Sequence, residues 1–259
     1  MTEDAGKAGA GSGGAPRPRP GLDADLRAVA RHTELLVDHA THLTDVRAPS
    51  LCEGWSRAHV LSHVARNADA IRRLAEWALD GQPREMYPGG TAARDAEIEE
   101  GALRAGPASA GDHRPAGVFA DDLRSTAAAL APPLAALGGP LAVDEVEMRG
   151  GMKISPRALP FMRLREVVYH HVDLDDGFSF TDVEPEVLHR FIDDAVSRLR
   201  TGSHPPDLDL RTQEGDRWVV GEPTTEVRGS RAGVLLWLAR RIDTGVSATG
   251  DLPQLPRGA

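Results

Sequence analysis

Apolar side chains recur with helical spacing in one stretch after another through the first two thirds of this 259-residue chain. The spacing predicts helices over residues 23–43, 56–81, 91–104, 118–137 and 159–175. Four of these five stretches are counted as long helices, and each has an apolar stripe that another element must cover. We therefore predict a helical bundle, with a kink or break at Pro132 and Pro133, whose interior can host a functional site.

The pattern changes after Gly177. A helix is predicted over residues 185–200, followed by strands over 207–212, 218–221 and 225–229 and a last helix over 230–241. Residues 141–156 could form a short strand or an ordered excursion. We predict a disordered leader (residues 1–21), which has almost no large apolar side chains, a bundle domain (22–176) and a small α+β C-terminal domain (177–259).

Charge and cysteine content restrict the possible partners. The formal net charge is −9 and the basic residues are scattered, which argues against nucleic acid and anionic membranes. No signal peptide and no apolar run long enough to span a bilayer is present in the sequence, so we expect a cytoplasmic protein. The single cysteine, Cys52, excludes an intramolecular disulfide and is interpreted as a small buried hydrophobe.

Glu166 and His170 are the strongest candidates for chemistry. They lie four residues apart in an apolar-periodic stretch, so a helix presents both on one face. His59 and His63 have the same spacing on the helix predicted over residues 56–81, and either could supply a third ligand. Two imidazoles and one carboxylate suit Zn²⁺ with an open fourth position, which is typical of a catalytic site.

Two neighbours of this pair have open roles. His171 points about 100° away from His170 around a helix, which makes it a surface residue or a support for the ligands. Asp173 could orient a ligating histidine through its other ring nitrogen, or it could be an exposed carboxylate at the helix end.

Three blocks of sequence carry a resemblance to a known family. They are LCEGWSRAHVLSHVARNADA (51–70), MYPGG (86–90) followed by RDAEIE (94–99), and REVVYHHVDL (165–174). Together they resemble the mycothiol-dependent maleylpyruvate isomerase family, over roughly residues 22–245. The resemblance implies a DinB-like four-helix bundle with a divalent metal, usually zinc, and a smaller α+β C-terminal domain.

Carried over residue by residue, the family's metal ligands fall on His63, Glu166 and His170. DinB relatives generally use three histidines, and glutamate in the first position of the later pair marks the isomerase-like branch. The family also uses an arginine of the C-terminal domain, which the Trp-Leu-x-x-Arg pattern assigns to Arg241, with Arg240 as the alternative.

The implied function is mycothiol-dependent isomerisation of maleylpyruvate to fumarylpyruvate in gentisate degradation, by reversible thiolate addition at a zinc site. The partners would be a dicarboxylate substrate and a low-molecular-weight thiol, with mycothiol rather than Cys52 supplying the sulfur. The alternative enzyme is a DinB-like mycothiol S-transferase acting on an electrophile. A regulatory zinc-binding module is the third interpretation, although such modules usually carry cysteine-rich motifs.

Overall fold

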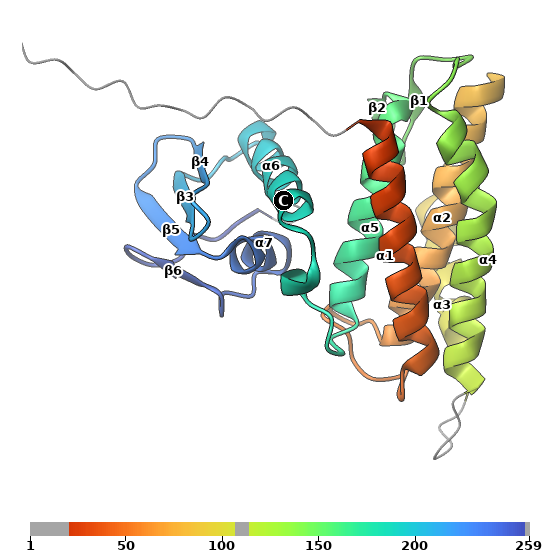
Figure 1. Cartoon of the computed structure of the whole chain (residues 1–259), viewed down its shortest axis with the longest axis horizontal. Helices are drawn as coiled ribbons and strands as arrows, with labels where there is room; N and C mark the ends of the chain where they lie inside the picture. The colour runs from red at the N-terminus through yellow and green to blue at the C-terminus, as the bar shows by residue number, and fades with distance from the viewer. Residues whose placement is uncertain (1–20, 107–113, 257–259) are drawn as a thin grey trace, which may run out of the picture.

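The computed structural model describes residues 21–106 and 114–256, and this part of the chain begins with a helical bundle. Its helices are α1 (Leu22–His42), α2 (Arg57–Asp80), α3 (Gly90–Leu103), α4 (Arg114–Ala136) and α5 (Leu159–Asp173). Figure 1 shows α1, α2, α4 and α5 side by side, with α3 packed on α2. The predicted bundle is therefore confirmed, whereas the predicted leader lies outside the described residues apart from Gly21.

The ends of α2 follow from local chemistry. At its start, the His59 ring nitrogen Nδ1 lies 2.7 Å from Ser56 Oγ and accepts a hydrogen bond from the Ser56 N–H. At its end, Gly81 adopts a φ of +75° and donates its N–H to the Trp77 carbonyl. The sequence predicted a kink or break at Pro132 and Pro133. Helix α4 is not broken there and continues through both prolines to Ala136.

A short hairpin connects α4 to α5. Its strands, β1 (Val146–Glu147) and β2 (Lys153–Ile154), pair antiparallel, and Gly150 and Gly151 form the turn with φ values of +85° and +81°. These values suit glycine, which lacks the Cβ that disfavours the left-handed region. The buried Val146 packs the hairpin against α2, which places the turn beside the bundle.

The rest of the chain forms an α/β layer. Its elements are α6 (Pro185–Thr201), β3 (Leu208–Thr212), β4 (Arg217–Val220), β5 (Thr225–Gly229), α7 (Arg231–Arg240) and β6 (Val246–Ala248). The strand order is β4-β3-β5-β6, with β3 and β5 parallel and the other pairs antiparallel. The sequence predicted every one of these elements except β6. Among the described helices, none is both long and apolar enough to cross a membrane.

Helix α5 is packed on two sides. Val167 and Leu174 are buried in the bundle core, whereas Val168 and Tyr169 belong to the core formed with α6, α7 and the sheet. Tyr169 meets the ring of Phe191 edge-on at a centroid distance of 5.3 Å. Packing on both flanks therefore fixes the orientation of α5 and, with it, the side chains on its exposed edge.

Helix α7 depends on a close backbone approach at Gly233. A Cβ at this position would lie 2.3 Å from the carbonyl oxygen of Gly245, so Gly233→Ala must displace backbone. We expect it to lower the free energy of unfolding by about 1–3 kcal/mol. Gly117→Ala is the control, because a Cβ there meets nothing and should raise stability by about 0.5–1 kcal/mol. Urea unfolding of both variants measures the difference, and equal effects would contradict the packing argument.

Candidate metal centre

His63, Glu166 and His170 come together between α2 and α5. Glu166 Oε2 lies 3.2 Å from His63 Nε2 and 3.7 Å from His170 Nε2, and one ligand atom from each residue lies within 4.8 Å of the others. With metal–ligand bonds of about 2.0–2.2 Å, tetrahedral ligand atoms lie about 3.3–3.6 Å apart. Two nitrogens and one oxygen at these distances fit a divalent metal such as zinc.

The Glu166 carboxylate is positioned by a chain of polar contacts. Asn67 donates to Glu166 Oε2 at 3.3 Å, and Arg163 donates to Asn67 Oδ1 at 2.8 Å and to the Val64 carbonyl at 2.9 Å. Arg163 is almost completely buried, so these contacts cannot be exchanged for water. Because Arg163 occupies Asn67 Oδ1, the NH2 end of the Asn67 side chain is the end that points to the Glu166 carboxylate.

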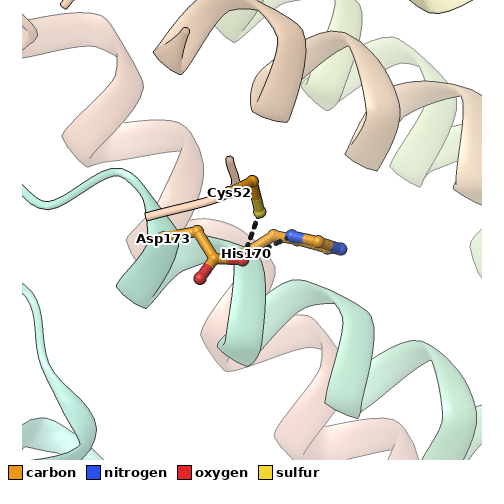
Figure 2. Close-up of side chains that lie close together, drawn as sticks. All are labelled: Cys52, His170 and Asp173. Carbon is orange, nitrogen blue, oxygen red and sulfur yellow. Dashed lines mark hydrogen bonds and ion pairs between the residues drawn. The ribbon is translucent and has the colours of Figure 1, made fainter. Parts of the chain in front are cut away.

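Asp173 orients the second histidine. Its Oδ2 accepts a hydrogen bond from His170 Nδ1 at 2.7 Å, which leaves His170 Nε2 facing Glu166. Arg240 binds both carboxylate oxygens, at 2.5 and 2.6 Å, and the Cys52 thiol donates to Oδ2 at 3.2 Å. Figure 2 shows Cys52, His170 and Asp173 gathered at this end of α5.

Cys52, His170 and Asp173 form a second group with atoms close enough for a metal. Both oxygens of Asp173 already bind Arg240, so a metal there would have to displace a bidentate ion pair. Burial, reinforced by the charge of Asp173, also raises the pKa of the Cys52 thiol to about 12, which disfavours the thiolate that metals bind. The better candidate for a metal site is therefore His63, Glu166 and His170.

The surroundings set the charge of the ligands. Burial and the nearby His170 lower the pKa of His63 to about 4, so this imidazole is neutral near pH 7. Burial alone would raise the pKa of the Glu166 carboxyl. The hydrogen bond from His63 and the charges of His170 and Arg165 nevertheless hold that pKa well below its usual range. A neutral imidazole at His63 and a carboxylate at Glu166 are the forms in which these two side chains coordinate metals.

The ligands border a cavity of about 420 Å³. Arg94, Arg149 and Arg165 supply its positive charge, and Trp55 and Tyr87 supply aromatic surface. The Arg94 guanidinium lies 6.0 Å from the Trp55 ring and 5.6 Å from the Tyr87 ring. Such a cavity can bind a small dianion next to the metal ligands.

The bundle also has a larger groove, of about 750 Å³, between α1 and α4. Its walls are mainly aliphatic, and neither histidine of the centre nor Glu166 contributes to it. The smaller cavity is the better candidate for catalysis because metal ligands and cationic side chains converge there.

The remaining predicted candidates have other positions. His59 caps α2 and contacts Glu99 at 3.0 Å, so it does not reach the centre. His171 turns to α1, where its Nε2 lies 2.8 Å from His39 Nδ1, and its ring stacks on Phe178 at a centroid distance of 3.7 Å. Asp173 adopts the first of its two predicted roles, since it is buried and bonded to His170.

The structure brings Arg240 to the centre and leaves Arg241, the residue favoured by the sequence pattern, outside it. Arg241 ends α7 with a φ of +63°, and its guanidinium donates to the carbonyls of Leu238 and Pro256. The left-handed turn therefore directs Arg241 away, whereas Arg240 remains on the last helical turn and faces Asp173.

The supporting residues Asn67, Arg94 and Arg163 were missed by sequence reasoning. Asn67 lies four residues after His63, so a helix presents both on one face, and this signal could have identified it. Arg94 contacts His63 Nδ1 at 3.2 Å from α3, a helix-to-helix contact that no spacing predicts.

Replacing Asp173 tests the orientation of His170. We expect Asp173→Asn to weaken metal binding by about 10- to 100-fold, because His170 loses its anionic partner. It should also lower stability, because the largely buried Arg240 loses its counter-charge. The adjacent, exposed Asp175→Asn is the matched control, and its φ of +49° suits asparagine. Metal affinity is measured by chelator competition, and equal affinity in both variants would contradict this role.

Comparison with known proteins agrees with this geometry. The family model for the mycothiol maleylpyruvate isomerase N-terminal domain matches residues 26–175. The crystal structure of the mycothiol-dependent maleylpyruvate isomerase is similar at a TM-score of 0.77 and 26% identity, covering 91% of this chain and 96% of that chain. The crystal structure of a histidine-to-alanine mutant of that isomerase is similar at a TM-score of 0.76 and 25% identity, with the same coverage of both chains. No curated protein matches the chain in sequence.

Proposed function

The chain belongs to the mycothiol maleylpyruvate isomerase family, and from this we propose that it is a metal-dependent enzyme that converts maleylpyruvate to fumarylpyruvate with mycothiol. The observation that carries the proposal is the convergence of His63, Glu166 and His170, from two helices, on an arginine-lined cavity. We further propose that it acts in the cytoplasm, in the degradation of gentisate.

The three ligands would hold Zn²⁺, or another divalent metal, and leave a coordination position open. A metal bound there supplies a Lewis acid that lowers the pKa of a thiol and polarises a carbonyl group. The chain prepares the ligands beforehand: burial keeps His63 neutral, and Asp173 holds the His170 ring in one orientation. Little rearrangement of α2 or α5 is then needed for binding.

The proposed reaction changes the geometry of one double bond. A C=C bond conjugated to a ketone does not rotate freely. Mycothiol bound in the cavity would supply a thiolate that can add reversibly to this bond. The C–S bond formed and the electron pair moved onto the carbonyl oxygen would leave a single bond free to rotate, and loss of the same thiolate would restore the double bond and the thiol.

Arg94 is the side chain best suited to bind a substrate carboxylate. Its guanidinium donates to His63 Nδ1, so in this state His63 carries its proton on Nε2 and donates it to Glu166. Coordination of His63 through Nε2 would require the proton on Nδ1 instead, and Arg94 could no longer donate there. The Nη2 of Arg94, whose Nη1 binds Asp95, would then be available for a carboxylate in the cavity.

Cys52 is an unsuitable nucleophile for this reaction. Its pKa of about 12, raised by burial and by Asp173, keeps the sulfur protonated near pH 7. Its S–H is also engaged with the Asp173 carboxylate. The sulfur in the proposal therefore comes from mycothiol.

The direct test combines purified protein, zinc, mycothiol and maleylpyruvate. We expect the enol absorbance of the substrate to fall only when both thiol and metal are present, and a chelator to abolish the change until zinc is restored. Glu166→Ala should lose metal and activity together, because it removes the only carboxylate of the ligand set.

Product analysis separates isomerase from S-transferase. Free thiol should be recovered after isomerisation, whereas a transferase leaves a stable thiol conjugate. Absence of any reaction with every divalent metal tried would overturn the proposed activity, and full metal occupancy in Glu166→Ala would overturn the ligand assignment.

The two arginines that end α7 provide a matched pair. Arg240→Lys should lower metal affinity by about tenfold or more, and turnover with it, because lysine cannot bind both oxygens of Asp173. Arg241→Lys should leave both quantities unchanged, since the hydrogen bonds of Arg241 to described residues go to carbonyl groups away from the centre. Chelator competition and steady-state kinetics measure the pair, and a loss of turnover confined to Arg241→Lys would reverse the assignment.

A further inference from the structure

A second hollow adjoins the cavity of the metal centre. It has a volume of about 770 Å³, and we call it the hairpin groove. It is formed by Trp77, residues 83–87, Gly89, Gly90 and residues 147–151 of the hairpin. Met86, Tyr87, Met148 and Arg149 line both the hairpin groove and the cavity. The two spaces are therefore neighbours along one wall, and a ligand could occupy both.

The sizes of the two spaces suit two reactants. The cavity has a volume of about 420 Å³. Sites for a single small molecule have volumes of about 300–1,000 Å³, so the cavity is near the lower end of this range. Mycothiol carries its thiol on a cysteinyl group attached to a bulky pseudo-disaccharide of glucosamine and inositol. The cavity can take the substrate and the thiol end, but the pseudo-disaccharide needs further space, which the hairpin groove provides.

The charges of the hairpin groove suit a neutral polyol. Glu85 and Glu147 balance Arg84 and Arg149, whereas the ionisable side chains around the cavity are richer in arginine. Arg84 is already paired with Asp80. Within the described residues, the side chains of Glu147 and Arg149 have no hydrogen-bond or ion-pair partner, so their charges are available for hydroxyl groups.

The walls of the groove leave room for sugar rings. Gly89 and Gly90 line one side, Gly150 and Gly151 the other, and a Cβ at Gly90, Gly150 or Gly151 would meet nothing within 4 Å. The half-buried Trp77 adds an aromatic surface, which suits the apolar C–H faces of a sugar.

We propose that the hairpin groove binds the glucosamine–inositol part of mycothiol, with Glu147 and Arg149 hydrogen-bonded to its hydroxyl groups. The thiol then extends past Tyr87 and Met148 into the cavity that His63 borders. This inference rests on the proposed function for the identity of the thiol. It adds the residues that select mycothiol over smaller thiols.

The test compares mycothiol with cysteine, which has the thiol but no pseudo-disaccharide. Glu147→Gln and Arg149→Gln remove the charges, and the matched controls on the same hairpin segment are Glu145→Gln and Lys153→Gln, which are exposed and line neither space. Calorimetry on the zinc-loaded protein should show a mycothiol Kd raised about tenfold or more in the two groove variants and unchanged in the controls. Cysteine should bind all five proteins, wild type included, equally.

The outcomes separate this inference from the proposed activity. An unchanged mycothiol Kd in both groove variants, or an equal loss of mycothiol and cysteine binding, would overturn the assignment of the groove. Groove-dependent mycothiol binding by a wild-type protein that does not isomerise maleylpyruvate would support the groove and overturn the isomerase proposal. Failure of the wild type to bind mycothiol would overturn both.

Discussion

The buried carboxylate of Asp173 links the metal centre to the rest of the structure. It forms hydrogen bonds with His170 on its own helix, with Arg240 at the end of α7 and with the thiol of Cys52 ahead of α2. The backbone carbonyl of Asp173 also accepts a hydrogen bond from the N–H of Leu51. Burial opposes ionisation, but the bonds from His170 and Arg240 hold the pKa of the Asp173 carboxyl well below its usual range. Such a buried charge is tolerated only when its partners are in place, so the position of α7 and the orientation of His170 depend on each other.

The packing of helix α5 fixes the positions of Glu166 and His170. Its apolar residues are buried on two flanks, so Glu166 and His170 project from a helix that cannot rotate without opening a core. The polar chain from Arg163 through Asn67 then restricts the Glu166 carboxylate. Burial lowers the pKa of Arg163 to about 10. Its Nη1 donates to Asn67 and to the Val64 carbonyl, whereas within the described residues its Nη2 is buried without a hydrogen-bond partner, so this support of the centre carries a desolvation cost. Preorganised ligands of this kind bind metal without rearranging the bundle.

Periodicity and motif spacing were enough to predict the bundle, the α/β layer and the shared helix face of Glu166 and His170, because these features follow from local helical geometry. The choice of His63 as their partner came from the family resemblance. Local patterns could not decide between Arg240 and Arg241, since the choice depends on a left-handed turn at a non-glycine residue. Nor could they separate His59 from His63, where the decisive contact is a helix cap. Strand β6 was missed because it has only three residues, paired with β5.

The distribution of charge around the centre gives each part of the proposed reaction its own environment. Imidazoles are uncharged when they coordinate a metal, so a divalent metal held by His63, Glu166 and His170 would retain one net positive charge to attract a thiolate. The cavity arginines would attract a dicarboxylate, while the balanced charges of the hairpin groove give it no net attraction for an anion. A dianionic substrate would therefore favour the cavity over the space assigned to the neutral pseudo-disaccharide. Separation by charge, rather than by shape alone, lets two reactants enter adjoining spaces without competing for them.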